Sequence, residues 1–206
     1  MQKLNISVLG TGDMGSAIAT AMSKRTGHSI RVRGSKAGSA SAIKLCGELG
    51  VSEATEQNFL DSDIVFVVVP AAAIPQAAAT LSGYRGIVVS VSVSGNVGRD
   101  GSASSAEDIA KALPGARVVN AFSSVWSNVV RNPGKLEKTS VFVCSDDEEA
   151  KATIVELVKE AGFDPINGGK LAMALYAEAM GMFAVRLATD SGYGRTITFH
   201  AFQVVQ

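Results

Sequence analysis

Six short runs of apolar, β-favouring residues recur along the chain, and they limit the possible folds more than any other feature. Several runs are apolar at consecutive rather than alternate positions, which is typical of strands that are covered on both faces. Such strands occur mainly in parallel sheets that lie between two layers of helices. The runs cover residues 6–9, 30–32, 64–69, 87–91, 118–122 and 141–144.

Helical patterns separate these runs. A capping pattern of Ser105 and Asp108 predicts the start of one helix. The acidic run 146–149 favours the start of another, which would end near Ala161 because Gly162 follows. This alternation predicts an α/β fold with a doubly wound, mostly parallel Rossmann sheet and a C-terminal helical extension. The first helix has apolar residues at i, i+3, i+4, i+7 and i+8, namely Met14, Ala17, Ile18, Ala21 and Met22.

The segment between the first run and the first helix matches the pattern GxGxxG in a strand–turn–helix context. Gly10 would permit the tight turn, Gly12 would let a pyrophosphate approach the backbone, and Gly15 would let the helix pack closely on the strand. Free N–H groups at the start of the helix would then face the phosphates. The alternative is a glycine turn without a ligand. The predicted cofactor-binding turn comprises Gly10, Thr11, Gly12, Asp13, Met14 and Gly15.

The end of the second run indicates which dinucleotide is bound. NAD-binding versions of this fold usually carry a carboxylate there for the ribose 2′-hydroxyl, but residues 27–42 contain none. Arg33, Ser35 and Lys36 instead offer two cations and a hydroxyl donor, which suit a 2′-phosphate. We therefore predict NADP as the cofactor. For Arg33, the alternative is a solvated charge on the surface.

Two further segments follow strands and are expected at the carboxyl edge of the sheet, where ligands bind in such folds. Val69 and Pro70 end the third run, and we expect them to contact the dinucleotide because Pro70 stops the strand there. The Gly/Ser-rich segment 92–105 contains Arg99 and Asp100. This segment is either part of the ligand-binding edge or a plain solvated connection.

Composition argues against several other classes of function. The formal net charge is zero, so a nucleic-acid partner is not expected. Cys46 and Cys144 form no CxxC pattern and fit reduced thiols in the cytosol. No signal peptide precedes the first run, and the apolar stretch 171–188 carries Glu178 and Arg186, which favours a buried helix over a membrane span. We expect a cytoplasmic protein without a membrane partner.

The chain lacks the usual patterns for acid–base, nucleophilic or metal catalysis. His28 and His200 have no metal-ligand spacing with cysteines or carboxylates. No serine elbow, Cys/His pair or P-loop lysine is present. Hydride transfer between two stacked rings needs positioning above all, because the cofactors carry the reactivity. We therefore predict no catalytic side chain and no metal.

Several segments, in order, resemble one family: the NADP oxidoreductases that depend on coenzyme F420, an 8-hydroxy-5-deazaflavin. Domains similar to these also occur in membrane ferrireductases. The resemblance implies hydride transfer between NADPH and a flavin-like ring. It rests on VLGTGDMGSAIA, GSK, DIVFVVVP, PGARVVNAFSSVW, VFVCSDDEEAKATIVELVKEAGFDP and GGKLAMALYAEAMGMFAVRLA.

This resemblance assigns functional roles known in the family to individual residues of this chain. Ser35 and Lys36 match its 2′-phosphate pair, with Lys in place of Arg, and Val69 and Pro70 match its strand-end contact. The strand end at Ala121 resembles the one that lies near the nicotinamide in the family. Ser123 stands at the position where the family often has Asn or His. Residues 172–175 are apolar where the family tends to place polar groups against the deazaflavin. The family's pyrophosphate turn is matched by Gly10, Thr11, Gly12, Met14 and Gly15.

We therefore interpret residues 1–168 as an NADP-binding Rossmann domain and 169–206 as a C-terminal helix and tail in the same compact unit. The predicted function is hydride transfer between NADPH and a small flavin-like or deazaflavin acceptor. The alternatives are a non-catalytic NADP(H)-binding redox sensor or partner protein, and an imine or ketone reductase. The helix over about 171–189 is apolar around most of its circumference, so we expect it to form a homodimer interface or the wall of a second-ligand pocket. The alternative is a core helix covered entirely by its own chain.

Overall fold

The computed structural model describes residues 2–94, 97, 103–133, 139–202 and 204. An eight-stranded sheet has the order β3-β2-β1-β4-β5-β6-β7-β8. Neighbouring strands are parallel except for β6 and β7, which are antiparallel. The prediction of a doubly wound, mostly parallel sheet is confirmed. The strands are β1 (Asn5–Leu9), β2 (Ser29–Arg33), β3 (Ser52–Glu53), β4 (Ile64–Val67), β5 (Ile87–Ser90), β6 (Arg117–Asn120), β7 (Ser140–Ser145) and β8 (Asp164–Gly169).

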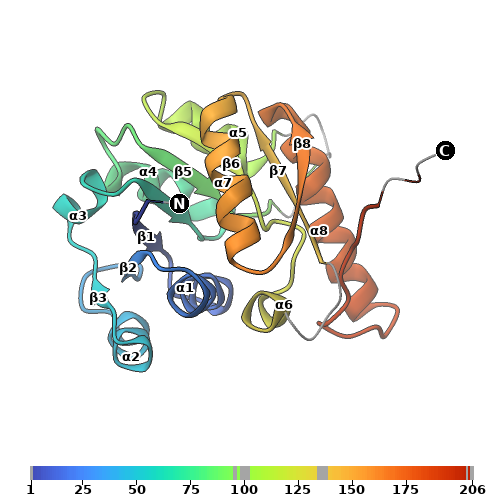
Figure 1. Ribbon diagram of the computed structural model, residues 1–206, viewed down its shortest axis with the longest axis horizontal. Helices are drawn as coiled ribbons and strands as arrows, with labels where there is room; N and C mark the ends of the chain where they lie inside the picture. The colour runs from blue at the N-terminus through green and yellow to red at the C-terminus, as the bar shows by residue number, and fades with distance from the viewer. Residues whose placement is uncertain (1, 95–96, 98–102, 134–138, 203, 205–206) are drawn as a thin grey trace.

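Helices cover both faces of this sheet (Figure 1). Successive residues of β4 point to opposite faces, so Phe66 joins the core beneath α1 and α7 while Val65 joins the core beneath α4 and α5. This double burial explains the continuous apolar runs. The helices are α1 (Asp13–Arg25), α2 (Ala40–Leu49), α3 (Glu56–Leu60), the 3-10 turn η1 (Ala71–Ala73), α4 (Ile74–Thr80), α5 (Ser105–Ala112), α6 (Ser127–Arg131), α7 (Glu148–Glu160), the 3-10 turn η3 (Leu171–Met173) and α8 (Ala174–Thr189).

Several predicted boundaries are wrong by one or two residues. The capping box of α5 is formed by Ser104 and Glu107, one position before the predicted pair, because Ser104 has the extended backbone that a cap requires. α7 is capped by Asp147, whose side chain accepts the N–H of Ala150 at 2.8 Å. Gly162 follows with φ 90°, as its predicted role at the end of that helix requires. Arg99 and Asp100 lie outside the described residues.

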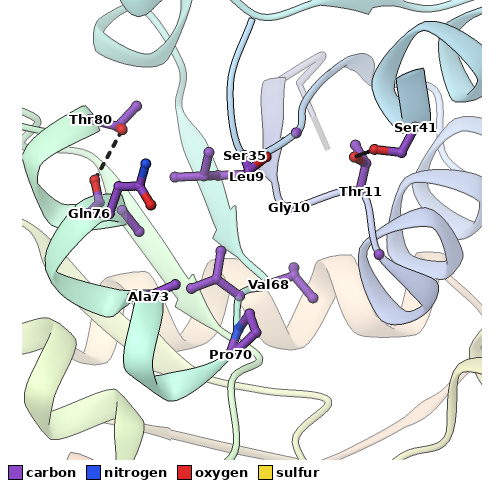
Figure 2. Close-up of a pocket in the computed structure, with 14 residues that line it drawn as sticks. Leu9, Gly10, Thr11, Ser35, Ser41, Val68, Pro70, Ala73, Gln76 and Thr80 are labelled. Atoms are coloured by element: carbon purple, nitrogen blue, oxygen red, sulfur yellow. Dashed lines mark hydrogen bonds between the residues drawn. The ribbon is translucent and has the colours of Figure 1, made fainter. Parts of the chain in front are cut away.

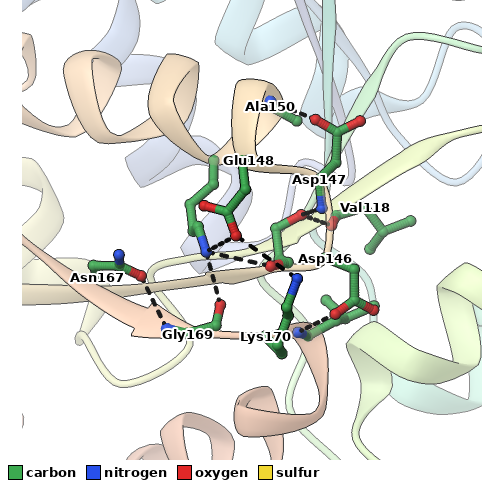
Figure 3. A network of polar contacts seen from close by, with 11 residues as sticks. Val118, Asp146, Asp147, Glu148, Ala150, Asn167, Gly169 and Lys170 are labelled. Carbon is green, nitrogen blue, oxygen red and sulfur yellow. Dashed lines mark hydrogen bonds and ion pairs between the residues drawn. The ribbon is translucent and has the colours of Figure 1, made fainter.

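A buried ammonium group fixes the turn that leads into the C-terminal helix (Figure 3). Lys151 of α7 is 5% exposed, and its Nζ donates to the carbonyl oxygen of Gly169 at 3.2 Å. The same Nζ lies 2.9 Å from a carboxylate oxygen of Glu148. Asp146 accepts the backbone N–H of Leu171 at 3.3 Å. These contacts tie the β7–α7 corner to the start of η3, and so set where α8 begins.

The C-terminal helix packs on the domain through small residues. α8 lies at the end of the sheet opposite to α2 and α3 (Figure 1). The described residues contain one helical stretch, Leu171–Asp190, whose length and apolarity would suffice to cross a membrane, and one third of it is buried inside the domain. The large apolar side chains of Tyr176 and Phe183 are 63% and 56% exposed. The buried residues of α8 are Ala174, Ala177, Glu178, Gly181 and Ala184.

Candidate functional site

A cavity of about 270 Å³ opens at the carboxyl ends of β1, β2 and β4 (Figure 2). This is the point where the strand order changes direction, since β1 pairs with β2 on one side and β4 on the other. Ligands of open α/β sheets bind at such points. The lining residues are Leu9, Gly10, Thr11, Gly12, Gly34, Ser35, Ser41, Val68, Val69, Pro70, Ala73, Gln76, Ala77 and Thr80.

The three glycines of the turn have different geometric reasons to be glycine. Gly10 has φ 112°, and a Cβ there would lie 2.0 Å from the carbonyl oxygen of Val68. A Cβ on Gly15 would lie 1.9 Å from the carbonyl oxygen of Gly10. At Gly12, by contrast, a Cβ would meet no atom of the described chain within 4 Å. Gly10 and Gly15 are therefore required by the fold, whereas Gly12 leaves open space on the cavity side.

The start of α1 leaves backbone donors available at this open space. Gly12 occupies the N-cap position and offers no side-chain acceptor to the first turn. The first N–H groups of a helix have no partner within the helix, and its N-terminus carries a partial positive charge. A pyrophosphate is the type of ligand that satisfies both features.

Hydroxyl groups line the far end of the cavity. Ser35 lies in the lining, and Ser41 of α2 shares a hydrogen bond of 2.7 Å with Thr11 (Figure 2). The sequence motif does not mark Ser41, because this residue lies on α2, beyond the strand exit to which the motif assigns cofactor contacts. Lys36 is exposed beside this end and is not part of the lining. The carboxylate of Glu53, which the motif does not mark either, accepts the N–H of Gly38 at 2.9 Å and 3.1 Å.

Two predicted cofactor residues have their side chains engaged elsewhere. The guanidinium of Arg33 donates to the carbonyl oxygen of Ala54 at 2.8 Å, so it is held beside β3 and outside the cavity lining. Asp13 accepts a hydrogen bond of 2.5 Å from Ser127 and pairs with Arg131 at 2.7 Å. The hydrogen bond from Ser127, supported by Arg131, lowers the pKa of Asp13. The side chain of Asp13 is thus bonded to α6, and its predicted role at the turn falls to its backbone N–H at the first position of α1.

Met14 and the exit of β4 complete the first cavity. The side chain of Met14 is half-buried and packs against the core on the α1 face, outside the lining. Val69 and Pro70 do line the cavity, although β4 ends at Val67, earlier than predicted. The hydroxyl of Ser92 donates to the carbonyl oxygen of Val69 at 2.6 Å. The exit of β5 thereby holds the exit of β4 in place.

A second, smaller cavity of about 110 Å³ lies between the exits of β5 and β6 and the middle of α8. We call it the α8 cavity. Ser123 lines it, and its hydroxyl donates to Asn120 at 3.0 Å. Ala121 is fully buried and lies outside the lining. Its lining residues are Val93, Ser123, Ser124, Val125, Trp126, Gly181, Met182, Ala184 and Val185.

The backbone turns sharply where β6 enters the α8 cavity. Phe122 has φ 62° and is the residue other than glycine with positive φ among those the structure describes. Such a conformation costs on the order of 1–3 kcal/mol and is held here by Phe163, which packs edge-on at 5.4 Å between ring centroids. Trp126 places a buried indole Nε1–H beside this cavity, and no described residue accepts it. Strained backbone and unpaired buried donors are more frequent at ligand sites than elsewhere.

The described residues contain no cluster of three or more His, Cys, Asp or Glu side chains that could hold a metal ion. Burial raises the pKa of the Cys144 thiol to about 11, so this buried cysteine is not a nucleophile. The geometry of both cavities thus offers backbone donors, hydroxyls and apolar walls. Groups of these kinds are suited to binding and orienting a ligand.

Residues 5–94 match the family model described as NADP oxidoreductase, coenzyme F420-dependent. This match confirms the family resemblance for the segment that contains the glycine turn and the exit of β4. Together, the fold and the glycine turn define the chain as a Rossmann-type α/β protein whose segment 5–94 resembles this oxidoreductase family.

Relatives of known name extend this result. The chain is 28% identical to metalloreductase STEAP3 of Rattus norvegicus over 106 residues. This aligned segment is 50% of this chain and 22% of that protein. The match therefore spans about a fifth of the curated relative. A putative F420-dependent NADP-reductase from Arthrobacter sp. FB24 has the same fold, with a TM-score of 0.80, 24% identity, and coverage of 97% of this chain and 100% of that chain. An imine reductase from Myxococcus stipitatus, solved with NAD+, shares the fold at a TM-score of 0.69 and 17% identity, over 94% of this chain and 63% of that chain.

Proposed function

We propose that this protein is an NADP(H)-dependent oxidoreductase that transfers hydride between NADPH and a flavin or 8-hydroxy-5-deazaflavin acceptor. The observation that carries the proposal is a pair of cavities, one at the glycine turn and one beneath α8, between which Ser92 at the exit of β5 donates to Val69 of the first cavity and the next residue, Val93, lines the second. The dinucleotide would lie across the first cavity with its nicotinamide directed toward Ser92 and the α8 cavity. The acceptor ring would approach from the α8 side.

The preference for NADP over NAD would arise at the end of β2. Ser35 lines the first cavity, and the exposed ammonium of Lys36 lies next to it in the chain. Ser41 and the N-terminus of α2 lie at the same end and add a hydroxyl and a partial positive charge. Glu53 is held by the backbone of Gly38, so its carboxylate faces the turn that follows Lys36. Ser35, Ser41 and Lys36 favour a 2′-phosphate, whereas the carboxylate of Glu53 is engaged by the Gly38 N–H and adds nothing to this preference.

The proposed reaction is a direct hydride transfer. The nicotinamide C4–H bond breaks with both electrons moving to the acceptor ring, which becomes reduced as the nicotinamide becomes oxidised, and any accompanying proton is exchanged with solvent. The protein would supply close alignment of the two rings and exclusion of water. Apolar walls from Val93, Met182 and Val185 suit that role.

A steady-state assay tests this function. NADPH oxidation would be followed with FMN, riboflavin and coenzyme F420 as separate acceptors, and with NADH in place of NADPH. The proposal expects turnover with at least one of these rings and a strong preference for NADPH. Tight NADPH binding without oxidation by any acceptor would refute catalysis.

That result would support the second candidate, a non-catalytic NADP(H) sensor or partner protein. The observation that favours this candidate is the small and largely apolar α8 cavity, in which Ser123 and Ser124 supply the hydroxyl groups. The exposed residues Ala172 and Met173 likewise offer no polar group to a deazaflavin.

The outward face of α8 supports the proposal of a homodimer. Small residues of α8 face the domain, whereas Tyr176 is exposed and Phe183 remains largely exposed although its ring stacks on Phe199 at 6.5 Å between centroids. An exposed apolar face of this kind usually marks an interaction surface. We extend the proposal to a cytoplasmic homodimer in which α8 packs against its copy.

A further inference from the structure

A carboxylate lies at the centre of the otherwise small and apolar buried face of α8. Glu178 is fully buried, and its neighbours on that face are alanines and a glycine. Burying an ionisable group in such surroundings is costly unless it is well bonded. Desolvation by burial raises the pKa of Glu178, while hydrogen bonds from the backbone oppose this shift.

The partners of Glu178 are backbone N–H groups from a single connection. One carboxylate oxygen accepts from Ser105 at 3.0 Å and from Ser94 at 3.4 Å, and the other accepts from Ala106 at 3.2 Å. Ser105 and Ala106 are the first residues of α5, whose own capping box uses Ser104 and Glu107 and leaves these two donors unsatisfied. Glu178 therefore completes the cap of α5 from another helix.

The hydrogen bond between Ser94 and Glu178 belongs to the segment that connects the two cavities. Ser92, Val93 and Ser94 are consecutive, and each connects to a different part of the site. Ser92 holds Val69 of the first cavity, Val93 lines the α8 cavity, and Ser94 donates to Glu178. The position of Val93 is thus fixed from both sides by hydrogen bonds.

One turn further along α8, Gly181 sets the closeness of the helix to β6. A Cβ on Gly181 would lie 2.2 Å from the carbonyl oxygen of Ser123, so α8 is in direct contact with the backbone that lines the α8 cavity. Glu178 and Gly181 lie on the same face of α8, three residues apart. The carboxylate therefore fixes the rotation and register of the helix at the cavity wall.

We propose that Glu178 is a positioning residue that couples α8 to the exit of β5 and thereby shapes the α8 cavity. It acts through the backbone of Ser94, Ser105 and Ala106 and does not touch the reacting rings. The role in acceptor binding rests on the proposed function, whereas the coupling of α8 to the β5 exit can be tested without it.

The test compares wild type with Glu178→Gln, in which an amide replaces the carboxylate at nearly constant volume. Trp126 is the only tryptophan in the chain and lines the α8 cavity, so its emission and its quenching by acrylamide report on that cavity. We expect acrylamide quenching of Trp126 to rise about twofold or more. Exchange of one of the two amides, Ser105 or Ala106, should accelerate by about tenfold or more, because glutamine keeps one acceptor oxygen and replaces the other with an NH2 group, which cannot accept.

Binding measurements separate positioning from general destabilisation. NADPH affinity should change less than about twofold, because the first cavity has no contact with Glu178, whereas KM for FMN should rise by about tenfold. Glu156→Gln is the matched control, since Glu156 is exposed on α7 and its loss should change none of these readouts. If wild type binds NADPH but reduces no acceptor, the proposed function fails while the Trp126 and exchange results still decide the coupling.

A second variant covers the case in which Glu178→Gln does not fold. Ser105→Pro removes one donor to Glu178 at the first helical position, where proline is tolerated. It should raise Trp126 quenching in the same direction. Unchanged Trp126 quenching and amide exchange in whichever variant folds would overturn the proposal. A decrease in NADPH affinity as large as the increase in KM for FMN would also overturn it.

Discussion

Gly12→Val separates cofactor binding from folding more sharply than any other change in the glycine turn. Gly12 has φ −69°, which every residue can adopt, and a Cβ there meets no described atom within 4 Å. The cost of folding is that of a valine at a helix N-cap, about 1 kcal/mol. The branched side chain would instead fill the space in front of the first N–H groups of α1.

The expected loss of binding follows from those N–H groups. A pyrophosphate at this helix start would accept at least two charge-assisted hydrogen bonds, each on the order of 1.5–3 kcal/mol. Losing them corresponds to a decrease in NADPH affinity of about 100-fold or more. Calorimetric titration with NADPH, combined with urea unfolding of the same samples, measures both quantities.

Gly10→Val is the matched comparison. Its φ of 112° and the 2.0 Å approach to Val68 make any side chain at Gly10 incompatible with the turn. We expect it to lower the free energy of unfolding by about 3 kcal/mol or more. Gly12→Val with normal NADPH affinity would refute the assignment of the cavity, and Gly12→Val as unstable as Gly10→Val would refute the reading of the turn geometry.

Three further predictions concern the cofactor, the assembly and pH. Lys36→Glu should lower NADPH affinity by about 10- to 100-fold and leave NADH affinity nearly unchanged, because it places a carboxylate beside the 2′-phosphate; equal losses for both dinucleotides in calorimetry would contradict this. Phe183→Arg should shift a dimer toward monomer in sedimentation with NADPH affinity retained, since Phe183 is exposed on α8 and is not part of the lining of the first cavity; a wild type that is monomeric at all concentrations would disprove the dimer. Because the pKa of Glu178 is raised, the folded protein binds this proton more tightly than the unfolded chain does. Protonation of Glu178 therefore stabilises the fold fully below the pH at which an exposed glutamate titrates. This stabilisation is lost as pH rises through the raised pKa. The difference in unfolding free energy between wild type and Glu178→Gln should therefore shrink with rising pH across that window, and a constant difference would count against it.

The sheet and the glycine turn could be predicted because their signals are local. The run around Phe66 is apolar on both faces because both faces are covered. Gly15 is restricted by Gly10 within the same turn, and Gly10 has a positive φ that favours glycine, although its close neighbour Val68 lies at the exit of β4. β8 was not predicted because its sequence, DPINGG, is rich in proline and glycine and has no apolar alternation. The antiparallel pairing of β6 and β7 likewise depends on how the chain connects, which apolar runs do not encode.

Side-chain partners across long sequence separations account for the rest. Asp13 pairs with Arg131, 118 residues away, and nothing in the turn motif distinguishes a carboxylate that faces the cofactor from one that faces α6. Arg33 was interpreted from its charge, but its partner is the backbone of Ala54. Glu178 was noted only as a charge that argued against a membrane span, because its three backbone partners lie more than 70 residues earlier in the chain.

The central claim is that this chain carries hydride from NADPH to a flavin-like ring. The most direct measurement is a single-turnover reaction with NADPH deuterated at both C4 positions of the nicotinamide, followed by mass spectrometry of the acceptor. With coenzyme F420, the account predicts one deuterium at C5 of the reduced deazaflavin. Reduced acceptor that contains only solvent-derived hydrogen at C5, or bound NADPH that never loses its deuterium to any acceptor, would contradict it.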